Sequence, residues 1–136
     1  MVHTGVSEEG FTHHIARFAL EHSLGELPSP VGDASINMMI NAAAAALAGA
    51  SQQESLTITQ FVQDMGGNGK CTVIGMGLRT SPVNAALANG AMIRLLDFDD
   101  EIVGSGIHPS AIIFPVVMAL AEMNGDTGRT VLNAFA

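Results

Sequence analysis

Apolar side chains recur along this sequence at helical spacing, and the pattern predicts six helices. The clearest stripe lies at positions i, i+3, i+4 and i+7 and consists of Ile58, Phe61, Val62 and Met65. Glycine, proline and capping residues mark the boundaries between the helices. The predicted helices cover about residues 7–24, 30–50, 51–65, 81–96 and 109–123, and the last begins near residue 127.

Capping residues mark several predicted helix starts. Ser7 is the expected N-cap of the first helix, with acidic residues in its first turn. One face of that helix holds Phe11, Ile15, Phe18 and His22. Ser51-Gln-Gln-Glu54 has the spacing of a capping box. Ser81-Pro82 places a serine cap before a proline at the first helical position, where proline costs no hydrogen bond.

Two helices are predicted to be internal. The side of helix 30–50 that is apolar consists largely of alanine and glycine, so another helix can approach it closely. Asn37 and Asn41 argue against a membrane span for this helix. Helix 109–123 is apolar nearly all round, so we expect it to be buried, with a kink at Pro115.

Only one segment has the character of a strand. Thr72, Val73 and Ile74 form a short extended piece between glycines. The predicted fold class is therefore all-α, a multi-helix bundle with at most one short extended segment near residues 71–75. The apolar turn before Ala136 has no cap, and the bundle is expected to be a partial copy of a larger helical domain.

Composition and charge exclude several functions. The net charge is −8 with only five basic residues, so the basic patch of a nucleic-acid-binding protein is missing and anionic membranes are disfavoured. The longest strongly apolar run, residues 111–121, is too short to span a bilayer. Cys71 is the only cysteine and can form neither an internal disulfide nor a zinc site with other cysteines. These features favour a cytoplasmic location.

The richest chemistry lies between residues 97 and 108. Asp97-Phe-Asp-Asp-Glu101 places four carboxylates within five residues, and His108-Pro-Ser follows. Crowded carboxylates and an imidazole could exchange protons with a substrate. Two alternatives remain open: a solvated acidic loop with His108 capping the next helix, and a metal site, although the spacing matches no standard metal motif.

Several motifs occur in the order of a known family. They are Ala46-Leu-Ala-Gly49, Ala86-Leu-Ala-Asn-Gly90, Leu96-Asp-Phe-Asp-Asp100, His108-Pro-Ser110, Ala119-Leu-Ala-Glu122 and Gly125-Asp-Thr-Gly128. Together they resemble the MmgE/PrpD family, which includes 2-methylcitrate dehydratase and cis-aconitate decarboxylase. The resemblance extends from about Phe11 to the end of the chain.

The resemblance implies a large helical domain and a smaller lid domain in a homodimer, with lyase or isomerase chemistry on small polycarboxylates and no metal or organic cofactor. Residues 1–136 would then be the N-terminal portion of the helical domain. Asp97 and His108 match the family's active-site aspartate and histidine. Glu101 stands where members commonly have threonine, and Arg94 stands where many have histidine. The family's substrate-binding lysines would lie beyond Ala136.

The sequence therefore predicts dehydratase-like carbon–oxygen lyase chemistry on a polycarboxylate such as 2-methylcitrate. Asp97 and His108 would transfer protons, with either one as the base, and Arg94, Glu101 and Arg79 are candidate substrate-binding residues. With few cations the chain alone is expected to be inactive. The alternatives are a non-catalytic helical module that dimerises or pairs with the missing remainder, and an unrelated metal-binding helical protein.

Overall fold

The computed structural model describes residues 10–21 and 27–136 of this chain. Within that part, helices dominate and two short strands form a small sheet. The elements in chain order are α1 (Phe11–Glu21), α2 (Ser29–Ala50), α3 (Glu54–Asp64), β1 (Cys71–Val73), β2 (Leu78–Thr80), α4 (Pro82–Arg94), α5 (Pro109–Asn124) and α6 (Gly128–Phe135). The predicted all-helical class is confirmed.

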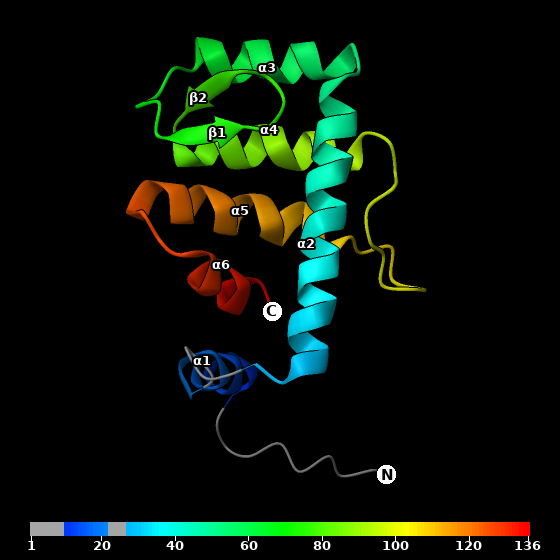
Figure 1. Cartoon of the computed structure of the whole chain (residues 1–136), viewed down its shortest axis with the longest axis vertical. Coiled ribbons are helices and arrows are strands. Elements are labelled where there is room, and N and C mark those ends of the chain that lie inside the picture. The colour runs from blue at the N-terminus through cyan, green and yellow to red at the C-terminus, as the bar shows by residue number, and fades with distance from the viewer. Residues whose placement is uncertain (1–9, 22–26) are drawn as a thin grey trace.

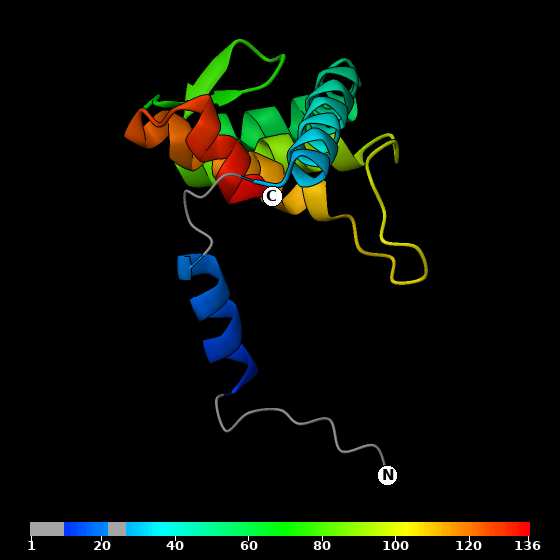
Figure 2. The ribbon, with the colours of Figure 1, turned by 60° about the horizontal axis from the view of Figure 1, so that its bottom comes forward.

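The helices are stacked along one long helix. Figure 1 shows α2 as the long vertical helix, with α3 at its upper end, α4 and α5 packed against it and α6 beside its lower half. The sheet packs against α4, its strand β1 also contacts α5, and α4 and α5 pack side by side. Figure 2 shows α1 standing apart from the other helices. Because α4 and α5 are joined by the loop of residues 95–108, the candidate chemistry lies at one end of this central pair.

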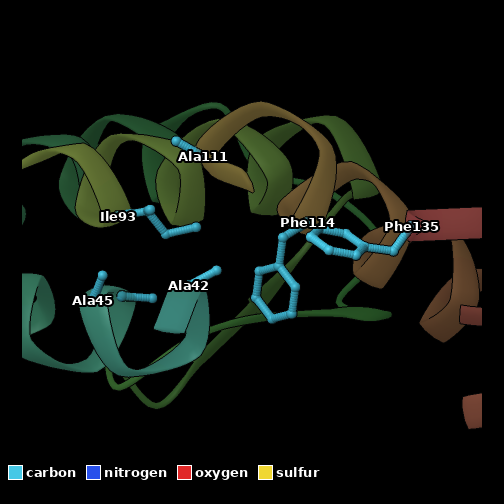
Figure 3. Packing of buried hydrophobic residues seen from close by; sticks show 7 residues of the cluster. Ala42, Ala45, Ile93, Ala111, Phe114 and Phe135 are labelled. Atoms are coloured by element: carbon cyan, nitrogen blue, oxygen red, sulfur yellow. The ribbon is translucent and has the colours of Figure 1, made fainter. Parts of the chain in front are cut away.

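The largest core cluster lies where α2, α4, α5 and α6 meet. Figure 3 shows small side chains of α2 facing α4 and α5. The rings of Phe114 and Phe135 pack edge to face, with centroids 6.4 Å apart, and so join α5 to α6. The buried members are Ala42, Ala45, Ala46, Ile93, Ala111, Phe114 and Phe135.

The predicted close packing of the alanine-rich helix is confirmed. Gly49 of α2 touches the backbone of α4, and a Cβ atom there would lie 2.1 Å from the carbonyl oxygen of Met92. On α4, a Cβ at Gly90 would approach the carbonyl oxygen of Ala111 to 3.0 Å. The three helix backbones thus meet through small residues, and these contacts fix how α4 and α5 sit on α2.

By length and composition, α2 is the one described helix long and apolar enough to cross a membrane. The same properties are found in core helices of soluble proteins. In this fold α2 packs as part of the bundle, because it contributes Ala42, Ala45 and Ala46 to the core and contacts α4, α5 and α6.

The expectation that the helix at 109–123 is buried all round is wrong within the described chain. One face is buried and includes Ala111, Phe114 and Ala119. The opposite face is exposed at Ile112 (65%) and Val116 (44%). Apolar composition alone cannot reveal which face has a partner, because the described chain places α2, α4 and α6 against only part of this helix.

The predicted serine cap at Ser81 is confirmed, because its side chain accepts a hydrogen bond from the backbone N–H of Asn84 at 3.3 Å. The predicted capping box at 51–54 is wrong. Ser51 Oγ instead donates to the carbonyl oxygen of Ala48 at 2.6 Å, so it ends α2, and α3 begins at Glu54 without a side-chain cap. A serine between two helices can serve either one.

The extended segment at residues 71–75 is half of a hairpin. β1 pairs antiparallel with β2, a second strand that the sequence did not predict. Gly75 and Gly77 adopt positive φ values in the turn, which lets the chain reverse. Asn89 of α4 binds β1 through Ile74 N at 2.8 Å and the Thr72 carbonyl at 2.9 Å, so the hairpin is fixed to the bundle.

The first predicted helix is present as α1. Ser7 and His22, its expected cap and the end of its expected stripe, lie outside the described residues. Phe11 and Ile15 are exposed, and α1 buries none of its residues in the described chain. In α3, only Val62 of the predicted stripe is buried, while Phe61 and Met65 are exposed.

Candidate active site between α4 and α5

Asp97 lies in the turn that follows α4 and has an unusual backbone conformation. Its φ is +56°, and it is the one described non-glycine residue with positive φ. Asp and Asn tolerate this left-handed region better than most residues. The Asp97 N–H donates to the Arg94 carbonyl at 3.3 Å, which closes the last turn. The chain therefore turns sharply at the residue that the sequence singled out.

Three side chains of the candidate site contact one nitrogen atom of Arg94. Its Nη1 lies 2.8 Å from Asp97 Oδ1, 2.5 Å from Asp99 Oδ1 and 2.8 Å from His108 Nδ1. Asp99 Oδ2 lies 3.3 Å from the same His108 nitrogen. The last turn of α4, the acidic loop and the start of α5 thus converge at one point, as the sequence required of Asp97 and His108.

The two carboxylates beside Arg94 differ in environment. The Asp97 side chain is 74% exposed, whereas that of Asp99 is fully buried at 0% and that of His108 is 19% exposed. Asp99 Oδ2 has no hydrogen-bond partner among the described residues. Asp99 was missed as a site residue, because the sequence shows four adjacent acids without showing which one turns inward. The one feature of the sequence that could have pointed to Asp99 is its position two residues after Asp97.

The loop that carries these residues is held at both ends. Asn41 Nδ2 of α2 donates to the Phe98 carbonyl at 3.2 Å. Asp100 Oδ1 accepts from the Ser110 N–H at 3.2 Å, so a carboxylate sits at the positive N-terminus of α5. His108 occupies the N-cap position of α5, as the capping alternative predicted, but its side chain makes no cap bond and its Nδ1 faces Arg94 and Asp99 instead.

A cavity of about 700 Å³ opens beside Arg94 and His108. It lies between α4 and α5 and is lined mainly by apolar groups. Gly106 and Ile107 of the loop form one side, and Ile112 and Val116 of α5 form another. Arg94 and His108 are the charged or titratable residues in its wall, so polar chemistry in this cavity must occur at that end.

The electrostatics of the cluster are dominated by carboxylates. Partial desolvation lowers the pKa of Arg94, but hydrogen bonds and charges from Asp97 and Asp99 outweigh it and raise the pKa overall. Arg94 therefore stays cationic. One guanidinium faces two carboxylates, and Asp100 and Glu101 follow directly, so the carboxylates outnumber the guanidinium and the local charge is negative.

Asp97, Asp99 and His108 also form a group that could hold a metal ion, since their ligand atoms all lie within 4.8 Å of one another. The Arg94 Nη1 atom already contacts all three residues. A metal ion would have to displace this guanidinium from all three residues.

The other two candidate residues lie differently. Glu101 is an exposed loop residue. Arg79 lies on β2, where its guanidinium donates to the Gly69 carbonyl and to Thr72 Oγ1, both at 3.1 Å, and to the Lys70 carbonyl. The structure does not bring Arg79 to the Arg94 cluster, because these bonds commit it to the hairpin.

Cys71 is a buried structural residue. Its side chain is fully buried, and its thiol donates to the Ala119 carbonyl at 3.2 Å. Burial, and secondarily the charge of Glu122, raises the pKa of this thiol. A protonated, inaccessible thiol is a poor nucleophile, which agrees with leaving Cys71 out of the site.

Arg94 and His108 lie in the wall of a cavity between two helices, and Asp97 and Asp99 contact Arg94 beside it. Carboxylates, an imidazole and a guanidinium are groups used in general acid–base chemistry. Residues 13–136 match the MmgE/PrpD N-terminal domain. The chain belongs to the MmgE/PrpD family.

Its similar proteins include cis-aconitate decarboxylases. The chain is 29% identical over 125 residues to the cis-aconitate decarboxylase of Aspergillus terreus, covering 92% of this chain and 26% of that protein. It is 32% identical over 100 residues to the human cis-aconitate decarboxylase, covering 73% and 21%. A cis-aconitate decarboxylase-like protein of Aspergillus oryzae is 26% identical over 122 residues, covering 90% and 25%. The chain thus spans about a quarter of the length of these relatives.

Proposed function

We propose that this chain carries the acid–base part of a lyase active site for a small polycarboxylate. Asp97 and His108 would exchange protons with the substrate, and Arg94 would hold both side chains in place. The observation that carries the proposal is the convergence of Asp97, Asp99 and His108 on Arg94 Nη1 beside the cavity. The relatives' names supply the chemical class.

The chemistry of both candidate reactions needs such a pair. In a decarboxylation, the carbon–carbon bond to the carboxylate breaks, its electrons stay on the remaining carbon and an acid delivers a proton there. In a dehydration of 2-methylcitrate, a base removes a proton and hydroxide leaves with a proton from an acid. The names of the relatives favour decarboxylation of a tricarboxylate related to cis-aconitate over dehydration.

Substrate binding needs cations beyond those in this cluster. Arg94 is already paired with Asp97 and Asp99, so the net field at the cavity repels a polycarboxylate. We therefore propose that further cationic groups complete the site, supplied by a longer chain or by a second subunit of a cytoplasmic homodimer. Glu101 would oppose binding of a substrate carboxylate at its own position.

The alternative is a non-catalytic helical module that binds a partner. It is favoured by the apolar face of α5, where Ile112 is 65% exposed and Val116 is 44% exposed. Exposed apolar groups of this kind are typical of interfaces. A catalytic domain that packs on further parts of an enzyme would expose the same faces, so activity must separate the two functions.

A chimera tests the proposal. Residues 13–136 would replace the matching quarter of the Aspergillus terreus relative, and decarboxylation of cis-aconitate and dehydration of 2-methylcitrate would be measured by NMR. We expect decarboxylation, and we expect Asp97→Asn and His108→Gln each to reduce kcat at least about a hundredfold, the size of effect typical of an acid–base group.

The matched control is Asp126→Asn, an exposed carboxylate between α5 and α6 that should leave turnover unchanged. A folded chimera without either activity, or one whose turnover survives loss of His108, would show that the chain acts as a binding module instead.

A further inference from the structure

The proposed proton transfer by His108 leaves the buried Asp99 without a role. Its side chain is 0% exposed, and Oδ1 is bound to Arg94 at 2.5 Å. Its second oxygen, Oδ2, is also buried and has no hydrogen-bond partner among the described residues. A buried carboxylate oxygen without a donor is costly. The ring nitrogen Nδ1 of His108 lies 3.3 Å away and can donate to this oxygen when it carries a proton.

Two hydrogen-bond arrangements compete at that nitrogen. Arg94 Nη1 lies 2.8 Å from His108 Nδ1 and could donate to it, which would put the ring proton on Nε2. Alternatively, Nδ1 carries the proton and donates to Asp99 Oδ2. Only one of these can hold at a time, because Nδ1 of a neutral imidazole is either an acceptor or a donor.

The proton inventory favours the second arrangement. Nη1 of arginine has two protons, and the carboxylate oxygens of Asp97 and Asp99 lie 2.8 and 2.5 Å from it. Bonds from a guanidinium to carboxylates are stronger than a bond to a neutral ring nitrogen. With both protons directed at the carboxylates, Arg94 has none left on Nη1 for His108, whereas Asp99 Oδ2 still needs a donor.

We propose that Asp99 is the positioning residue of this site: it accepts the Nδ1 proton of His108 and so leaves Nε2 as the ring nitrogen that exchanges protons in the cavity. The inference rests on the proposed function only in giving Nε2 a substrate. Carboxylates that hold the far nitrogen of a histidine fix its tautomer and orientation in the same way in other sites. Asp97, exposed and bound to Arg94 alone among these groups, remains free to face substrate.

The tautomer can be read directly by NMR on the 136-residue chain. Long-range ¹H–¹⁵N correlation distinguishes a protonated ring nitrogen from an unprotonated one, and the His108→Gln variant assigns the signal among the five histidines. At about pH 8.5, where an ordinary imidazole is neutral, we expect His108 to carry its proton mainly on Nδ1. In Asp99→Ala we expect the majority tautomer to change to Nε2–H.

Asp97→Asn is the matched control, since it removes the charge of the other carboxylate but keeps an oxygen that can accept the Nη1 proton of Arg94, and it should leave the Nδ1–H tautomer in place. A wild-type spectrum dominated by Nε2–H, or a tautomer unaltered by Asp99→Ala, would overturn the assignment. Where Asp99→Ala does not fold, the wild-type spectrum decides alone. The measurement needs no turnover, so an inactive chimera with the Nδ1–H tautomer would end the proposed function and leave this inference standing.

Discussion

Asp97 combines a backbone role with a side-chain role. Its carboxylate binds Arg94, and its left-handed backbone, in the turn after α4, directs the chain into the acidic loop. Residues held in such conformations cost free energy and are often found at functional sites. The two roles can be separated by substitution, because alanine removes only the side-chain contact whereas glycine also relieves the backbone.

We therefore expect Asp97→Gly to be about 1 kcal/mol more stable than Asp97→Ala, the approximate cost of the left-handed region for a residue with a Cβ atom. Both variants lose the ion pair with Arg94, so the comparison isolates the backbone. Urea denaturation at equilibrium measures the difference. The same pair of substitutions at Glu101, an exposed residue without positive φ, should give a glycine variant no more stable than the alanine variant. Equal stabilities at position 97 would contradict the backbone argument.

At the residue scale, the sequence predicted the meeting of Asp97 and His108 but not the inward turn of Asp99. The meeting of Asp97 and His108 followed from the order of the motifs, since the loop between α4 and α5 is short enough to bring its two ends together. The second depends on tertiary packing: Asp99 is buried beside Asn37, Met38 and Asn41 of α2 around a small cavity. Spacing within the acidic run carries no information about which side α2 will cover.

At the element scale, helix positions follow from the periodicity of apolar residues and from the capping, proline and glycine residues at the helix ends. The Ser81-Pro82 start and the Gly125 end of the neighbouring helices were predictable because the chemistry of both signals is local. The second strand was not predictable, since Leu78–Thr80 is ordered by pairing with Cys71–Val73 and by contacts to α4. The burial of α5 was overestimated for a similar reason, because the elements that pack against a helix determine which of its faces are buried.

The contact between α2 and α4 can be tested with two glycines of one helix. A Cβ at Gly49 would meet the backbone carbonyl of Met92 at 2.1 Å, and backbone cannot move aside as a side chain can. We expect Gly49→Ala to destabilise the fold by about 3 kcal/mol. Thermal and urea unfolding of the variant against the wild type measure this loss.

Gly32 of the same helix is the control, because a Cβ there would meet nothing within 4 Å. Replacing a helical glycine in open space reduces the entropy of the unfolded chain, so Gly32→Ala should be neutral or stabilising by up to about 1 kcal/mol. Similar effects at the two positions would mean that α2 and α4 are not in close backbone contact.

At the scale of the whole molecule, the net charge and the exposed apolar surface both indicate that a partner covers the candidate site. The chain has a net charge of −8, and the Arg94 cluster is itself short of cations. Beside that cluster, apolar residues of α4 and α5 that line the cavity are exposed, among them Leu87 (47%) and Ile112 (65%). A cavity wall that is apolar, open and adjacent to polar chemistry is better explained by a covering partner than by contact with water.

This surface should make the purified chain self-associate. We expect its sedimentation coefficient to rise with concentration and the chain to bind a dye that reports exposed apolar groups, because burying these faces releases ordered water. Replacing Ile112 and Val116 together by glutamine should weaken association without loss of helix content, since both side chains are exposed and their removal leaves the core intact. Val103→Gln is the control: this residue is 96% exposed at the loop tip and lies outside the cavity wall. If the wild-type chain stays monomeric at high concentration and binds no dye, or if Val103→Gln weakens association as much as the double variant, the cavity wall between α4 and α5 is not the surface that a partner covers.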